Sequence, residues 1–496
     1  MAAHGKVYRV GDNPPSSEFY ESGKFGRLFG RLPPFAGDSP TLRSGLKALG
    51  ALGGPMDAKD ELTSDPKQLI LDANLFKNNP DNPNMTAGMT FLGQFIDHDL
   101  TLDISSSLEQ QVDPEMIQNF RTPTLGLDSI YGQGPAGSPY LYDQTVDHGQ
   151  TQLLVVPIAG SEAHSRDGSV KYDMPRNVQG TPLIGDPRND ENLVLSQLHV
   201  AFLKFHNAVV EQVRAASPHL TPSEVFAEAQ RLVRWHYQWI IVHEFLPLTV
   251  GQALVDSVLH DGCRHYNVRK RAYIPVEFSV AAYRFGHSQV RPSYRVNFGP
   301  SDAQQVFALL FNDGLAVNPV AEDMRGGIQG PHRFIDWQTF FDFGDGRARN
   351  NKRIDTRLST VLMDLPGVPS AEPQSLASRN LLRHLTFRMP SGQAVARAMK
   401  VTPLSAEDLK ELKPFNLEER TPLWFYVLKE AEVHADGKRL GEVGGRIVAE
   451  VMIGLLQADA TSYLSQDPNW TPHLGATPDQ FRMTDLLRVA GVVTAL

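Results

Sequence analysis

Cysteine is the residue that this sequence most nearly lacks, and its scarcity excludes two kinds of site. Cys263 is the only cysteine in 496 residues, so the chain can form no intramolecular disulfide and no metal site built from several cysteines. So low a cysteine content fits a reducing compartment, although a secreted protein without disulfides would have it too. Long hydrophobic runs are also missing. Apolar stretches such as Trp239–Val242 fall far short of the about 18 apolar residues that span a bilayer.

Basic charge is in deficit as well. Acidic residues outnumber basic ones by 56 to 47, which gives a formal net charge of -9. No basic field would draw the whole protein to nucleic acid or to an anionic membrane. The polar stretch Met1–Val10 does not resemble a signal peptide, so we expect a cytoplasmic protein or one exported without such a signal. The sequence does not determine the oligomeric state.

The chain is expected to form one large helical unit. Residues 1–65 are rich in Gly, Pro and Ser and predict an irregular N-terminal arm. Residues 105–190 also lack helical periodicity, and long ordered loops of this kind tend to be functional. We therefore predict a mainly α fold, with a single helical domain over residues 66–496, long loops and few short strands.

Two sequence signatures predict where helices begin. Apolar residues recur at helical spacing from Leu193 to Val209. Thr221–Glu224 is a capping box with proline at the first helical position, and we expect its helix to run to about Phe245 and to end at Leu246-Pro247. Thr477–Gln480 is a second such box, which predicts another helix near the C-terminus.

One stretch gathers polar side chains on a single predicted helix, Met89–Leu100. Gln94, Asp97 and His98 stand at i, i+3 and i+4 and share a face, whereas Asp99 points elsewhere. A histidine between carboxylates can be a metal ligand, a general base or a buried structural residue. No second His or Cys stands at ligand spacing, which disfavours zinc. Taken alone, this stretch does not decide between the other interpretations.

Three further stretches are equally ambiguous by themselves. Arg188 could be a surface charge or part of a salt bridge, and Glu191 could favour the positive end of the following helix. His287 follows Gly286, which lets a bulky group approach the backbone, but a lone histidine is more often structural. Asn380–Arg383 says nothing about chemistry on its own.

Together, the four stretches resemble the animal-type haem peroxidases, the superfamily that also contains cyclooxygenases and fatty-acid dioxygenases, and its soluble bacterial members in particular. The resemblance runs from about Phe25 to Leu487 in the family's order. Its strongest signatures are Gln-x-x-Asp-His-Asp at 94–99, Arg-x-x-Glu at 188–191 followed by His206-Asn207, Arg-Phe-Gly-His at 284–287, and Asn380 ten residues before Pro390. Supporting matches occur at 128–132, 244–247 and 441–446.

The resemblance assigns four residues to the proximal side of a haem b. His287 would be the axial ligand of the haem iron, because a proximal imidazole is the usual peroxidase ligand. Asn380 would hold the other ring nitrogen of His287 and so fix its tautomer. Arg284 and Arg383 would lie near the haem propionates and form charge-assisted hydrogen bonds.

The resemblance assigns three residues to catalysis on the distal side. His98 would take a proton from one oxygen of hydrogen peroxide and return it to the leaving oxygen, as general base and then general acid. Arg188 would stabilise the charge that develops as the O–O bond breaks. Gln94 would hold distal water and help to bind halide.

The same resemblance implies that the haem is covalently attached. Asp97 and Glu191 match the carboxylates that form ester bonds to haem methyl groups in this family. Asn192 occupies the position where some members carry a methionine bonded to a haem vinyl group, so we expect this third link to be absent.

A calcium site is also implied, and one of its ligands has been lost. Asp99 would bind calcium together with Thr122, Thr124 (through its carbonyl) and Asp128. Gly126 stands where the family has an acidic ligand. Because calcium takes six to eight oxygens, the site would bind calcium weakly, use water in place of the carboxylate, or be empty.

The implied function is reduction of hydrogen peroxide to water with oxidation of small donors such as phenols, amines, halides or thiocyanate. The nearest alternative is a fatty-acid dioxygenase, which needs a tyrosine three residues before the proximal histidine. Arg284 stands there, and Tyr283 is one residue further back. A non-catalytic haem-binding protein is a more distant alternative, and retention of both His98 and Arg188 argues against it. The motifs do not reveal the electron donor.

Overall fold

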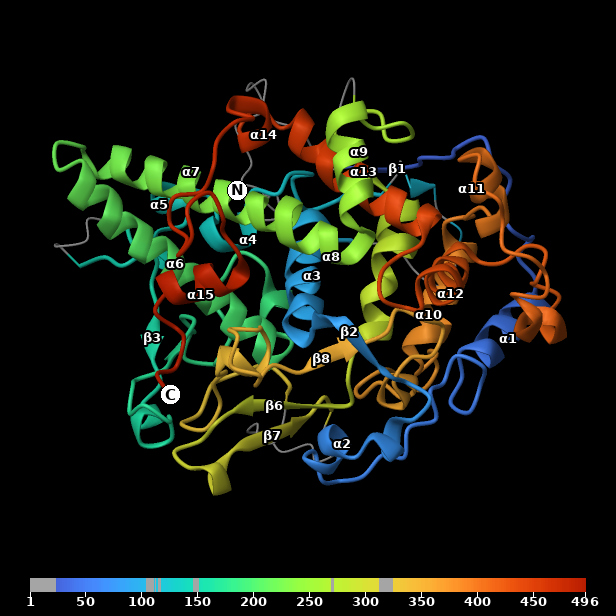
Figure 1. The fold of residues 1–496 in the computed structure, drawn as a ribbon, viewed down its shortest axis with the longest axis horizontal. Coiled ribbons are helices and arrows are strands. Elements are labelled where there is room, and N and C mark those ends of the chain that lie inside the picture. The colour runs from blue at the N-terminus through green and yellow to red at the C-terminus, as the bar shows by residue number, and fades with distance from the viewer. Residues whose placement is uncertain are drawn as a thin grey trace, which may run out of the picture.

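Helices dominate the computed structural model, which describes residues 24–103, 111, 113–114, 117–145, 151–268, 272–311 and 324–496 (Figure 1). The longer helices are α1 (Pro40–Leu49), α3 (Ala87–Leu100), α6 (Leu193–Ala216), α7 (Pro222–Ile240), α9 (Gln252–Asp261), α10 (Leu376–Thr386), α12 (Leu423–Ala435) and α13 (Glu442–Ala458). The shorter ones are α2 (Gln68–Leu71), α4 (Asp128–Tyr131), α5 (Gly134–Gly137), α8 (Leu246–Val250), α11 (Gly392–Ala398), α14 (Tyr463–Gln466) and α15 (Met483–Val489). The predicted mainly α class is confirmed.

Strands are few and short across the described residues. The pairs are β1 (Phe25–Gly26) with β5 (Ile274–Pro275), β2 (Asp81–Thr86) with β8 (Asn350–Lys352), β3 (Val156–Pro157) with β4 (Tyr172–Asp173), and β6 (Ser293–Asn297) with β7 (Val306–Leu309). Only the first pair is parallel. Each forms a separate two-stranded sheet, so helices build the core of the described part.

Helix α3 lies near the middle of the molecule, with α6 on one side of it and α10 and α12 on the other (Figure 1). Aromatic rings fix it against its neighbours: Phe95 of α3 stacks on Phe202 of α6 at 4.7 Å, and Tyr237 of α7 meets both rings edge-on. All three are buried, and burying a side chain of this size contributes about 1.5–3 kcal/mol. α3 also contacts the short helix η8 (Ala282–Gln289), so two of the predicted functional stretches lie side by side.

Helix α6 begins where the sequence predicted. Its N-terminus is capped by Asn192, whose side-chain oxygen accepts a hydrogen bond from the Leu195 amide at 2.9 Å. Among the described helices it is the one long and apolar enough to cross a membrane, with a mean hydropathy of 1.3 over its best window. However, 83% of that window is buried inside the protein, as expected for the central helix of a core.

The first capping box is confirmed, but its helix does not stop where expected. Thr221 and Glu224 cap each other's backbone groups at the start of α7. The helical path continues through a π-helical turn, Ile241–Phe245, into α8. Pro247 does not end this path and is the second residue of α8, directly after the π-helical turn. The helix ends instead at Gly251, whose φ of +90° an L side chain rarely adopts.

The prediction of a second capping box was wrong. Thr477–Gln480 forms a turn in which Asp479 has a left-handed backbone, with φ of +58°. The helix near the C-terminus, α15, begins only at Met483. Its first turn is held by Asp485, which accepts a hydrogen bond from the Arg482 amide at 3.0 Å.

The predicted arm is regular in part. α1 lies within residues 24–65 and packs against α10, while residues 1–23 lie outside the described part of the chain. The division into an arm at 1–65 and a domain at 66–496 stays a prediction. Where residues 105–190 are described, they carry only short helices and short strands, as predicted.

Candidate active site

A cavity of about 570 Å³ lies where α3, the short helix η5 (Pro187–Asp190), η8 and α10 meet. The predicted haem-site residues that line it are Gln94, Asp97, His98, Arg188, Glu191, Arg284, His287 and Arg383. Asn380 stands behind the wall and contacts His287. The fold therefore brings together side chains that are almost 300 residues apart in sequence.

The face of α3 that the sequence predicted is the one that lines the cavity. Gln94 donates a hydrogen bond from its amide nitrogen to a carboxylate oxygen of Glu191. Asp97 accepts one from the Thr101 hydroxyl at 3.1 Å. Burial raises the pKa of the Asp97 carboxyl, since a charged carboxylate is poorly solvated there. Burial likewise raises the pKa of Glu191, to about 7.

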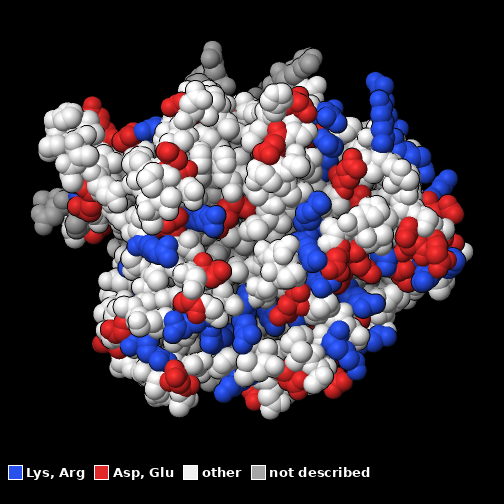
Figure 2. Space-filling view, viewed as in Figure 1, with Lys and Arg blue, Asp and Glu red and all other residues white. Residues whose placement is uncertain are grey.

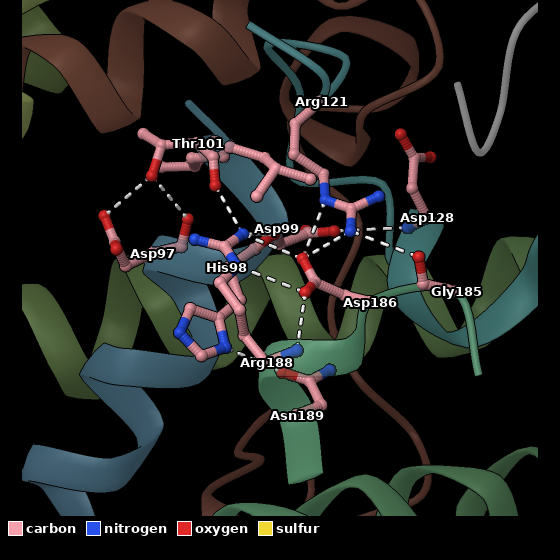
Figure 3. Close-up of polar contacts among 12 residues, drawn as sticks. Asp97, His98, Asp99, Thr101, Arg121, Asp128, Gly185, Asp186, Arg188 and Asn189 are labelled. Atoms are coloured by element: carbon pink, nitrogen blue, oxygen red, sulfur yellow. Dashed lines mark hydrogen bonds and ion pairs between the residues drawn. The ribbon is translucent and has the colours of Figure 1, made fainter. Parts of the chain in front are cut away.

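His98 is held by one ring nitrogen and presents the other to the cavity. Its Nδ1 lies 2.9 Å from Oδ1 of Asn189 (Figure 3). Its Nε2 lies 3.9 Å from the Glu191 carboxylate. Burial lowers the pKa of His98 to about 3, and the nearby Arg188 charge acts in the same direction. The ring is therefore neutral at neutral pH and can accept a proton.

Arg188 is anchored at the end of α3 rather than free at the surface. It donates hydrogen bonds to Asp186 from Nε at 3.1 Å and from Nη2 at 2.8 Å, and to the His98 carbonyl at 3.1 Å (Figure 3). Asp186 also forms a buried ion pair with Arg121. Burial alone would raise the pKa of Asp186. Hydrogen bonds and charge from Arg188, together with the charge of Arg121, outweigh burial and lower this pKa to about 2.

Asn192, not Glu191, caps the N-terminus of α6. Asn192 also donates a hydrogen bond to the Gln94 carbonyl at 3.3 Å. Glu191 instead stands at the end of η5 with its carboxylate towards the cavity.

On η8, His287 lines the cavity and contacts Asn380 of α10 as predicted. The amide nitrogen of Asn380 lies 2.7 Å from Nδ1 of His287, and the amide oxygen accepts a hydrogen bond from Arg284 at 2.5 Å. Burial, and then the charge of Arg284, lowers the pKa of His287 to about 3. Arg383 lies 3.9 Å from Asp103. Two cationic side chains thus border the same cavity as a neutral histidine.

The residues predicted to bind calcium lie away from this cavity. Asp99 accepts hydrogen bonds from the backbone amides of Leu127 and Asp128, both at 3.2 Å. Oδ2 of Asp128 is buried without a hydrogen-bond partner. A Cβ at Gly126 would lie 3.1 Å from the Thr124 hydroxyl and 3.4 Å from Asp128 Oδ1, so a carboxylate there would face the same group of oxygens.

Thr122 lies at the start of this loop, where its carbonyl accepts a hydrogen bond from the Thr124 amide at 2.7 Å. Burial raises the pKa of both loop carboxyls, to about 8 for Asp99 and about 6 for Asp128. No cluster of three or more His, Cys, Asp or Glu side chains that could hold a metal occurs among the described residues. The two aspartates would need backbone and hydroxyl oxygens to complete a calcium shell.

Part of the chain is similar to one protein family. Residues 105–337 match the family model of the animal haem peroxidase. This match spans 233 of the 496 residues. Among relatives, it is 30% identical to chorion peroxidase of Aedes aegypti over 26% of its own length and 17% of the relative's. It is 25% identical to peroxinectin A of Dictyostelium discoideum, over 46% of this chain and 42% of the relative. The chain thus spans less than half the length of these curated relatives.

The fold of the peroxidase domain extends over nearly the whole chain. Peroxidase A from Dictyostelium discoideum superimposes with a TM-score of 0.59 at 16% identity, covering 96% of this chain and 94% of that one. A fatty acid alpha-dioxygenase from Arabidopsis thaliana superimposes with a TM-score of 0.58 at 14% identity. The superposition covers 96% of this chain and 76% of the dioxygenase. At such low identity these likenesses show the shared fold alone.

Tyr283, one residue before Arg284, also lines the cavity. Its hydroxyl donates a hydrogen bond to the Gly93 carbonyl at 3.0 Å, and its ring stacks on Phe278 at 4.7 Å. Both contacts fix the side chain in place.

Sequence reasoning missed the side chains that hold the predicted site residues in place. Asp186 anchors Arg188, Asn189 contacts His98, and Asn192 connects Gln94 to α6. Only Asp186 had a local signal, because an aspartate before a proline is typical of a helix N-terminus, and its carboxylate does accept from the Arg188 amide at 2.9 Å.

Proposed function

We propose that this protein is a haem peroxidase, which reduces hydrogen peroxide to water and oxidises small electron donors. The observation that carries the proposal is that one cavity is lined by His98, Arg188 and His287 together. A neutral histidine, an anchored guanidinium and a second histidine fit acid–base cleavage of a peroxide beside an iron.

The cavity residues fit a haem. His287 is held through Nδ1 by Asn380, and no hydrogen bond to its Nε2 occurs among the described residues, so that nitrogen is available for iron. Arg284 and Arg383 border the cavity and would pair with the propionates. When bound, haem would supply the iron and the electrons needed for cleavage of the O–O bond.

The distal residues then move one proton. Nε2 of His98 would take a proton from one oxygen of hydrogen peroxide and return it to the other, which would leave as water. Arg188 stabilises the negative charge on that departing oxygen from a position already fixed by Asp186, so little reorganisation is needed. Gln94 holds distal water and takes part in binding halide. Phenols, amines, halides or thiocyanate are the donors.

Two finer proposals concern how the haem is held and whether calcium is bound. Asp97 and Glu191 line the cavity and are proposed to form ester bonds to the haem, without a third link at Asn192. Asp99, Asp128, and oxygens of Thr122 and Thr124 are proposed to hold a calcium ion. The buried Asp128 oxygen without a partner supports that site, because a buried polar atom is normally satisfied.

A comparison of two substrates tests the function. The purified holoprotein should oxidise guaiacol when hydrogen peroxide is added, and should consume little oxygen with linoleate. Dioxygenase chemistry remains the second candidate, because Tyr283 lines the cavity and the fold is shared with a fatty acid alpha-dioxygenase. Oxygen uptake with linoleate that is abolished by Tyr283→Phe would favour that alternative over the peroxidase.

A further inference from the structure

A single buried amide connects two histidines beside the cavity. Oδ1 of Asn189 lies 2.9 Å from Nδ1 of His98, and Nδ2 of Asn189 lies 3.2 Å from Nδ1 of His199 on α6. The three residues are 0%, 4% and 1% exposed. Water is therefore excluded, and each of these polar atoms depends on its protein partner.

The amide couples the protonation sites of the two rings. An amide oxygen only accepts hydrogen bonds, so with Asn189 Oδ1 facing His98 the ring proton must be on Nδ1, which leaves a lone pair on Nε2. The amide nitrogen only donates, so Nδ1 of His199 must be the acceptor and its proton must be on Nε2. A flipped amide would reverse both tautomers at once.

Only one of the two arrangements gives a base. With the proton on Nδ1, Nε2 of His98 presents its lone pair to the cavity. In the flipped arrangement Nε2 would carry the proton, and His98 could not accept one from a peroxide. The Glu191 carboxylate, 3.9 Å from Nε2, is beyond hydrogen-bond distance and so does not hold a proton there.

We propose that Asn189, itself oriented by His199, is a positioning residue that fixes His98 in the tautomer with Nε2 unprotonated. The backbone of Asn189 is held in place, since it belongs to η5 and its backbone N–H donates to the Asp186 carbonyl at 3.0 Å; the two histidines orient the side-chain amide. This role rests on the proposed peroxidase function, in which the unprotonated Nε2 accepts a proton from peroxide.

Long-range ¹H–¹⁵N NMR of the ring nitrogens tests the tautomer directly. The full chain would be labelled at histidine and loaded with zinc protoporphyrin, whose diamagnetic metal leaves signals near the cavity observable. In the unaltered protein we expect protonated Nδ1 and unprotonated Nε2 for His98. Asn189→Leu removes the acceptor and should shift His98 to a mixture or to the Nε2–H form. Asn189→Asp, which only accepts, should restore Nδ1–H.

A second pair of variants keeps the test valid if Asn189→Leu does not fold. His199→Leu leaves the Asn189 amide free to flip and should give mixed His98 tautomers, whereas His199→Gln offers an acceptor oxygen and should preserve the original one. The control is His206→Leu, on the same helix, where the imidazole forms hydrogen bonds with the Tyr131 hydroxyl and the Thr151 carbonyl and does not contact Asn189. It should leave His98 unchanged.

Peroxide kinetics of the iron-loaded proteins provide the link to function. Asn189→Leu should react at least about tenfold more slowly with hydrogen peroxide, within the range of about 10²–10⁴ that general acid–base catalysis contributes. Asn189→Asp should recover most of the rate.

Two outcomes overturn the inference: wild-type His98 tautomers in both Asn189→Leu and His199→Leu, or an equal shift in His206→Leu. The expected tautomers in a protein that does not react with peroxide would instead refute the proposed function and leave the role of Asn189 standing.

Discussion

At the scale of single residues, Arg188 is the side chain whose geometry matters most for peroxide cleavage. Its guanidinium binds Asp186 through two nitrogens and still reaches the cavity. Lysine has one compact charge and cannot do both. Arg188→Lys should therefore slow the reaction with hydrogen peroxide by roughly 10²-fold, comparable to loss of one preorganised donor, with unchanged haem absorbance.

The control for that variant is Arg231→Lys, because Arg231 forms an outer ion pair with Glu228 on α7. Stopped-flow absorbance measures both. An Arg188→Lys rate within about twofold of wild type would show that the two-nitrogen anchor is unimportant; the corresponding free-energy difference would be only about 0.4 kcal/mol.

The ester bonds are a second prediction at this scale. After treatment with peroxide, acid–acetone should extract little haem from the wild-type protein, because Asp97 and Glu191 both border the cavity. Asp97→Asn and Glu191→Gln should each release more haem, and the double variant should release nearly all of it. Complete extraction from the wild-type protein would contradict covalent attachment.

The sequence was sufficient to find the residues that face the cavity, but not those that support them. Gln94, Asp97 and His98 could be grouped because helical spacing places them on one face, and motifs located Arg188 and His287. Asn189 could not be found in this way, because its partners His98 and His199 are joined only by folding. The side-chain contact that orients a group is a property of the tertiary structure.

At the scale of helices, Glu430 shows how one element caps another. Its carboxylate, on α12, accepts hydrogen bonds from the amides of Val443 and Gly444 at the start of α13. Burial raises its pKa from 4.5 to about 7. The folded state thus binds a proton more tightly than the unfolded state, so this contribution to stability is complete below pH 4.5 and is lost as pH rises through 7.

Glu430→Gln should remove that pH dependence while keeping an acceptor for α13. Between pH 4.5 and pH 8, the wild-type free energy of unfolding should fall by up to about 3 kcal/mol more than that of the variant. Urea unfolding at several pH values measures the difference. Parallel curves for the two proteins would mean that Glu430 does not bind a proton on folding in this range.

Helix boundaries show where local sequence signals fail. The box at Thr221 did cap α7, because its two side chains complete each other locally. The similar pattern at Thr477 formed a turn, and the path beyond Phe245 continued through Pro247. In both failures the same local pattern was compatible with two backbones, and packing against distant parts of the chain decided between them.

At the scale of the whole molecule, the proposed calcium site joins Asp99 of α3 to residues 122–128, which lead into α4. Protein stripped with a chelator should bind one calcium ion in a calorimetric titration, with saturation below about 10⁻³ M, the weak end of protein calcium sites. Gly126→Asp should tighten binding, because a side chain there faces Thr124 and Asp128, with a shift of a few tenths of an ångström in the Thr124 hydroxyl. Asp128→Asn should weaken it. No heat from either the wild type or Gly126→Asp would refute the site.

The central proposal is that His98 and Arg188 cleave peroxide within a cavity where His287 holds a haem. The most direct test is the second-order rate constant for hydrogen peroxide with the haem-loaded protein, measured by stopped flow for wild type, His98→Ala and Arg188→Ala. We predict a rapid reaction in the wild type and a loss of about 10²-fold or more in each variant, with haem still bound. Equal rate constants in all three proteins would contradict the claim.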